Sequence, residues 1–275
     1  MTALALALWL AAGDPIAHKG PGDPIALKGP WDPPCPEYLE ALSEGAERQD
    51  AFDDAGAAAG FERALGLDPE AVEARLALAQ VLNAQGESAT GPEAEAFFER
   101  ALRFAEALRA TRPDEPESHY WVAATNANLI AFRDGPEKVR LSREIEAAAR
   151  RALAIDPCFV PAYAVLGITY RELSGLGWFV RGIASGLFGG LPKGSLEDSE
   201  RLLGVAIELD PDDPFVRYQL ALTLERRKKP REAMAQLQQV LELPPRTARD
   251  LRLQSEAVGR LARLAAEDQR SLNKR

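Results

Sequence analysis

Apolar residues recur three and four positions apart along most of the chain, with charged residues between them. This spacing places the apolar side chains on one face of a helix. Ala, Leu, Glu and Arg, which favour helix, dominate, and β-branched residues are sparse. The pattern predicts an all-α fold with helices near 37–48, 51–67, 71–85, 92–111, 117–131, 137–155, 160–174, 196–209, 214–227, 230–242 and 247–265.

One short phrase recurs at the ends of predicted helices. ALGLDP ends at Pro69, ALAIDP at Pro157, AIELDP at Pro211 and VLELPP at Pro245, and a weaker version, LRATRP, ends at Pro113. The spacings between these prolines are 44, 44, 54 and 34 residues. Each proline ends one helix and fixes φ for the turn before the next. The recurrence indicates an array of repeated helix pairs.

The helix pairs also share an internal pattern. In the first helix a bulky residue precedes a large–small pair and a second bulky residue, as in Tyr163, Leu166, Gly167 and Tyr170. The other first helices carry Arg75, Leu78, Ala79 and Leu82; His119, Val122, Ala123 and Asn126; and Arg217, Leu220, Ala221 and Leu224. The second helices carry a stripe that is apolar at fourteen of fifteen positions: Ala57, Phe61, Ala64, Ala101, Ala105, Leu108, Ile145, Ala149, Ala152, Ser199, Leu203, Ala206, Ala233, Leu237 and Val240.

This pattern resembles that of tetratricopeptide repeat (TPR) proteins, whose repeats are helix–turn–helix units of 34 residues. The resemblance covers residues 37–265 and implies a right-handed helical solenoid of four full repeats after a less typical helix pair. The helix at 247–265 would cap the solenoid, because an end repeat must cover its apolar face.

Two subfamilies share further features with the chain. The SHYW at 118–121, the GWFVRGIASGLFG segment with its PKGS turn, and the closing LPPRTARDLRLQSEAVGRLARL resemble the regulator of microtubule dynamics family. A helical solenoid with long inserts also resembles the T-component of TRAP transporters, a periplasmic lipoprotein that would make this chain bacterial. The chain departs from that second pattern, because no cysteine follows its apolar N-terminus to carry a lipid.

An apolar, glycine-rich insert at 174–195 lengthens the third repeat by 20 residues. Three interpretations are open: a structural plug on the concave side, a wall of an apolar pocket, or a contact with a membrane surface. We expect the segment to be mostly buried near the SHYW helix. The residues expected to form this wall are Trp178, Phe179, Ile183, Leu187 and Phe188.

The two ends of the chain differ from the repeats. Residues 1–12 are apolar and resemble a secretory signal, with Ala11 and Gly13 as a small-x-small pair, although no Lys or Arg precedes them. Residues 13–36 form a Pro/Gly-rich linker with a nine-residue tandem, and 266–275 form a polar tail. We therefore favour a periplasmic or secreted location over a cytoplasmic one.

The net charge and the motifs of the sequence argue against several classes of function. A net charge of −9 argues against a nucleic-acid partner. Two cysteines, Cys35 and Cys158, lack metal-ligand spacing, and the sequence contains no nucleophile elbow, P-loop or HExxH motif. His18 is expected in a loop and His119 packed on a helix. We expect no enzyme activity, no cofactor, no metal and no transmembrane span.

In a TPR solenoid the first helices line a concave groove. The groove residues predicted here are Gln80, Asn83, Tyr120, Asn128, Arg171, Tyr218 and Arg226. The clamp for C-terminal carboxylates known in some TPR proteins needs Lys or Arg with Asn, but the corresponding positions hold Leu76, Tyr120 and Ala164. The leading hypothesis is a scaffold that binds a peptide or partner helix. The alternative is a carrier that holds an apolar molecule or lipid beside the insert.

Overall fold

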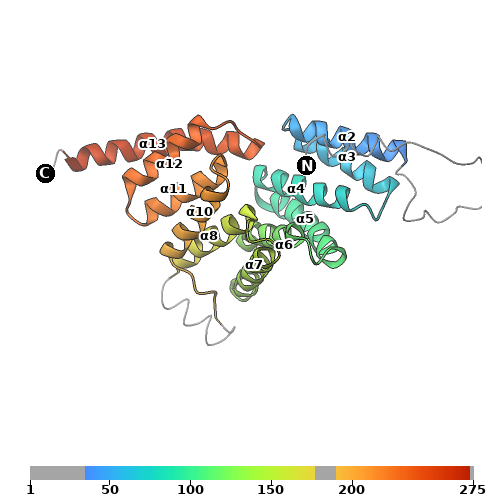
Figure 1. Ribbon diagram of the computed structural model, residues 1–275, viewed down its shortest axis with the longest axis horizontal. Coiled ribbons are helices and arrows are strands. Elements are labelled where there is room, and N and C mark those ends of the chain that lie inside the picture. Colours follow the sequence, from blue (N-terminus) through green and yellow to red (C-terminus); the bar gives the residue numbers. More distant parts are fainter. Residues whose placement is uncertain (1–34, 177–189, 273–275) are drawn as a thin grey trace, which may run out of the picture. The chain divides into compact units, whose positions relative to one another are not determined.

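The helices follow one another in antiparallel pairs, as Figure 1 shows for the computed structural model. The structure describes residues 35–176 and 190–272, and all of these except Cys35 belong to one compact unit, Pro36–Arg275. Within these ranges every regular element is a helix, which confirms the all-α, TPR-like solenoid. The elements are α2 (Pro36–Asp50), α3 (Asp54–Leu67), α4 (Val72–Ser88), α5 (Gly91–Thr111), α6 (Pro116–Leu129), η1 (Ile130–Phe132), α7 (Gly135–Ile155), α8 (Val160–Ser174), α10 (Leu196–Leu209), α11 (Pro214–Arg226), α12 (Pro230–Glu242) and α13 (Ala248–Leu272).

The predicted boundaries hold to within a few residues, with two instructive differences. Helix α3 starts at Asp54 rather than at 51, because Phe52 has a φ of 61° and Asp53 caps the helix by accepting from the Gly56 N–H. Helix α13 continues to Leu272, beyond the predicted end at 265. Its start is fixed by a capping box, in which Thr247 and Asp250 bond each other's backbone N–H.

The turns between repeats are built the same way four times. In each first helix, the side chain of the residue that opens the pattern forms a hydrogen bond with a backbone carbonyl oxygen. That carbonyl belongs to the loop proline six positions earlier in the chain. The bonds run from Arg75 to Pro69 (2.6 Å), His119 to Pro113 (2.8 Å), Tyr163 to Pro157 (3.0 Å) and Arg217 to Pro211 (2.8 Å). This common bond fixes the repeat register and gives His119 a structural role.

The stripes face the interior as predicted. All fifteen stripe residues of the second helices are at most 2% exposed. Small residues allow close helix crossings, because a Cβ added at Gly167 would lie 2.7 Å from Leu203 Cγ, and one at Gly60 would lie 2.7 Å from the Gly45 Cα. The α2–α3 pair, which precedes the four repeats, therefore packs backbone to backbone at Gly45 and Gly60.

Three predictions concern residues outside the described ranges. These are the insert wall (Trp178, Phe179, Ile183, Leu187 and Phe188), the apolar segment 1–12 and the linker as far as residue 34. At the edge of the insert, Arg143 Nε on α7 donates to the carbonyl oxygen of Gly190 at 2.8 Å.

Candidate binding surface

The inner face is defined here as the side of the first helices α4, α6, α8 and α11 that points away from their second helices. Between α4 and α6 it is held by side-chain amides. Asn83 Nδ2 donates to Thr125 Oγ1 at 2.7 Å, and Asn128 Nδ2 donates to Asn83 Oδ1 at 3.2 Å. Asn83 and Thr125 are buried, so these bonds satisfy groups that water cannot reach. Asn128 is half-buried, and no described residue donates to its Oδ1.

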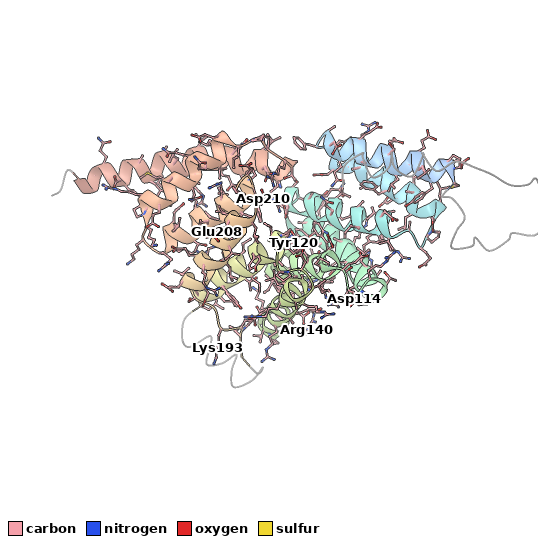
Figure 2. All side chains as sticks on the ribbon, viewed as in Figure 1. Asp114, Tyr120, Arg140, Lys193, Glu208 and Asp210 are labelled. Carbon is pink, nitrogen blue, oxygen red and sulfur yellow. The ribbon has the colours of Figure 1, made fainter. Side chains whose placement is uncertain are left out.

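An aromatic cluster continues the inner face from α6 towards α8. The ring of Tyr120 lies edge-on to Trp121, with centroids 4.8 Å apart, and to Phe159, at 5.7 Å. These geometries are favourable for aromatic pairs. Burial raises the pKa of the Tyr120 hydroxyl, and the nearby Arg249 partly offsets that rise. Figure 2 labels Tyr120 on α6.

Charged side chains hold the inner face between α8 and α11. Arg171 is 4% exposed and donates to the carbonyl oxygen of Gln219 and to Glu172, both at 3.0 Å. Arg226 donates to the carbonyl oxygen of Arg171 at 3.0 Å and to Glu172 at 2.8 Å. Burial lowers the pKa of Arg171, and the Glu172 carboxylate opposes that change by stabilising the charge.

Helix α13 packs on α11 and takes up part of its inner face. Tyr218, 2% exposed, donates to Glu256 at 2.5 Å and accepts from Arg260 at 2.9 Å. Burial, reinforced by the hydrogen bond to Glu256, raises the pKa of Tyr218 to about 12. Ala257 and Leu264 of α13 are buried in the same hydrophobic cluster. Tyr218 is thus committed to an internal contact.

The start of α13 also reaches the first repeat. Arg249 and Arg252 lie 3.6 Å and 3.7 Å from the carboxylate of Glu87 at the end of α4, and Arg252 donates to Ser88 at 2.9 Å. The Arg249 guanidinium lies 3.7 Å from the centre of the Phe215 ring, a cation–π contact. This clasp links residues 164 positions apart across the inner face.

The structure places the seven predicted groove residues in different surroundings. Gln80 is exposed, and Asn83 and Asn128 share one hydrogen-bond network. Arg171 and Arg226 form the charged network, whereas Tyr120 and Tyr218 lie in separate contacts. Sequence reasoning missed residues that join different repeats: Thr125, Gln219, Glu87, Phe215 and Arg249. The first two pair with residues 42 and 48 positions away, and the other three depend on the packing of α13, so no local motif marks them.

The described part of the chain carries hollows that are open to solvent. One hollow of about 720 Å³ lies at Phe132, Arg133 and Arg140, and another of about 620 Å³ lies between α10 and α12. Both are open to solvent, and neither includes a predicted groove residue. Charged side chains make up most of the lining of the first hollow and half of the lining of the second. Among the described residues there is no group of three metal-ligating side chains, and no described helix is long and apolar enough to cross a membrane.

The sequence matches a family model over most of its length. Residues 42–265 match the model described as regulator of microtubule dynamics protein 1-3. The chain belongs to that family. The matched region begins within α2 and ends within α13, so the amide network, the charged network and the clasp all fall inside it. No curated protein matches the chain closely. The resemblance to the TRAP transporter T-component is not tested by these matches.

A solved structure shows the same fold. The crystal structure of TTC0263, a thermophilic TPR protein from Thermus thermophilus, is 21% identical with a TM-score of 0.63, and the match covers 82% of this chain and 99% of that one. A looser likeness, at 14% identity and a TM-score of 0.47, is to MamA from Desulfovibrio magneticus RS-1, covering 77% and 97% of the two chains. The first likeness identifies the chain as a TPR protein in fold.

Proposed function

We propose that the chain is a non-catalytic scaffold that binds a protein partner, as an extended peptide or a helix, on the inner face of α4 and α6. The amide network between these helices is the observation that carries the proposal. Asn83 is fixed by Thr125 and in turn holds Asn128, whose free Oδ1 can accept from a peptide N–H. Gln80, exposed on α4, adds a donor and an acceptor beside it.

The neighbouring residues suit a peptide chain. Ala84, Ala124 and Ala127 are half-buried and uncharged, so a backbone can approach α4 and α6 closely. Trp121, half-buried beside Tyr120, adds an aromatic side chain at one end, and aromatic residues often act as anchors in protein recognition. The family name, regulator of microtubule dynamics, fits a protein that acts by binding other proteins.

The alternative, a carrier of an apolar molecule, has less to support it. The two hollows described above are open to solvent, and at least half of the residues that line each are charged, whereas an apolar ligand needs a pocket lined mostly by apolar side chains. The insert wall that motivated this alternative lies outside the described residues.

The test uses the full chain as bait in an extract of the native cell, with captured proteins quantified by mass spectrometry. The double variant Gln80→Ala, Asn128→Ala should lose a partner that the wild type retains. Gln238→Ala, at an exposed position on the second helix α12, is the matched control and should retain it. Equal capture by both variants would place the binding surface elsewhere and contradict the proposal.

A further inference from the structure

The clasp joins parts of the solenoid that are not neighbours along the chain. In a repeat array each repeat is expected to contact only the repeats beside it. Here Arg249 and Arg252 of α13 reach Glu87 and Ser88 at the end of α4, past all the intervening helices. Figure 1 shows the start of α13 beside α4. The repeat pattern does not by itself require this contact.

The clasp is polar and accessible to solvent. Its two ion pairs join the Glu87 carboxylate to Arg249 at 3.6 Å and to Arg252 at 3.7 Å, and all three side chains are 24–38% exposed. Ion pairs of this exposure stabilise a fold weakly and are screened by salt. No hydrophobic cluster of described residues includes both α4 and α13. The clasp can therefore break without exposing an apolar core.

On its α13 side, the clasp is attached to the start of α11. The Arg249 guanidinium lies 3.7 Å from the centre of the Phe215 ring in the first turn of α11. Burial raises the pKa of Asp213, which caps α11, while a hydrogen bond from Val216 and the charges of Arg246 and Arg249 oppose that rise. These contacts hold Arg249 on α11, so we expect α11 and α13 to move together when the contact with α4 breaks.

Charged groups of the clasp meet at Tyr120 on α6. Burial raises the pKa of the Tyr120 hydroxyl, and Arg249, Glu87 and Asp213 lie close enough to act on it through their charges. On α4, Glu87 follows Asn83 by four residues, so the two side chains lie on the same face of the helix, one turn apart. The clasp therefore adjoins both the aromatic cluster and the amide network.

We propose that the clasp is an electrostatic latch that controls access to the inner face of α4 and α6. In the closed state the two arginines hold Glu87, and α13 limits the approach to this face from its side. In the open state α11 and α13 swing away from α4 together, by small changes spread over the helix pairs between them. The inference rests on the proposed function, because a partner on this face binds the open state better and thereby opposes closure.

The first experiment measures the distance between α5 and α13 by pulsed electron spin resonance. Spin labels are attached at Ala96→Cys and Ser255→Cys, two exposed positions, in a background with Cys35→Ser and Cys158→Ser. About 1 M sodium chloride screens charges beyond about 3 Å, so it should raise the ratio of long to short distances by about tenfold. Glu87→Gln should show the long distances already at low salt and respond little to added salt.

Two controls separate opening of the latch from general effects of salt and charge. Labels at Ala59→Cys and Ala96→Cys both lie on the α4 side of the clasp, on α3 and α5, and their separation should not change with salt. Glu106→Gln, at an exposed position on α5, removes the same charge away from the clasp and should behave as the wild type. A distance from α5 to α13 that neither salt nor Glu87→Gln changes would overturn the proposal.

The second experiment asks whether the latch controls binding. In the native-cell extract, the double variant Arg249→Ala, Arg252→Ala should capture more of the protein that the wild type retains. Arg201→Ala, Arg270→Ala, at two exposed arginines outside the clasp, is the matched control and should capture the wild-type amount. Longer distances without increased capture would contradict control of access.

The distance measurement needs no partner, so the two proposals fail in different ways. If the inner-face double variant loses no partner, the proposed function fails, but the distances still decide whether the clasp opens.

Discussion

The two halves of the inner face are built from the same repeat but held by different chemistry. Between α4 and α6 neutral amides bond one another, and Gln80 stays exposed. Between α8 and α11 buried Arg171, together with Arg226 and Glu172, forms a charged network, and α13 covers Tyr218. The first half leaves the Oδ1 of Asn128 without a described donor, whereas the second uses most of its groups internally. The repeat pattern thus fixes the scaffold, and our proposal assigns binding to the half whose polar groups are not used internally.

The largest expected effect concerns the packing that both halves share. Gly167→Leu should lower the free energy of unfolding by about 1–3 kcal/mol, because its Cβ would lie 2.7 Å from Leu203 Cγ and 3.3 Å from the Ser199 carbonyl oxygen. Gly204→Leu on α10 is the control, since no atom lies within 4 Å of a Cβ added there. Urea denaturation followed by circular dichroism measures both. Equal stabilities for the two variants would show that the close crossing at Gly167 is unimportant.

The amide half should depend strongly on one side chain. Asn83→Ala should cost about 1–2 kcal/mol, because it removes the bonds to Thr125 and Asn128 and leaves a buried hydroxyl without its partner. The cost should be the same at low and high salt, since no charge is involved. A loss that shrinks on adding salt would mean that the amide network is not what Asn83 contributes.

The tyrosine beneath α13 should make stability depend on alkaline pH. The pKa of Tyr218 is raised to about 12 in the folded chain, against an ordinary value of 10.0. Between these values the unfolded chain binds fewer protons, so stability is fully present below pH 10 and falls as the pH rises towards 12. Tyr38 and Tyr170 contribute in the same direction. Denaturation midpoints at several pH values should therefore fall less steeply for Tyr218→Phe, and an unchanged slope would contradict the assignment.

The smallest effect belongs to the exposed part of the charged half. Arg226→Ala should cost under about 1 kcal/mol, because Arg226 and Glu172 are exposed and solvent screens their ion pair. The cost should shrink further in high salt, unlike that of Asn83→Ala. A double-mutant cycle with Glu172→Ala measures the pair directly. A coupling energy that is large and independent of salt would show that this network resembles the amide network after all.

Much of the fold was predictable because its causes are local. Helix ends follow the loop prolines, and helices α8, α10 and α12 match their predicted ranges, 160–174, 196–209 and 230–242. The stripes were predictable because residues three and four apart share a helix face, and all fifteen are buried. The candidate site was less predictable. Asn83 and Asn128 were expected in one groove and do share a network, but their common partner, Thr125, was not foreseen.

The sequence by itself determined the repeat: where each helix starts and stops, which face it buries and where small residues permit a close crossing. Only the tertiary structure decided what the last helix does. A cap was expected, and α13 does cover α11 through Ala257 and Leu264, but it leaves Leu251 and Val258 exposed and reaches Glu87 with two arginines. The physical reason is that helix periodicity identifies an apolar stripe without stating its partner. Which element packs on the stripe depends on how the rotation between successive repeats accumulates along the solenoid. No local sequence motif encodes that accumulated rotation.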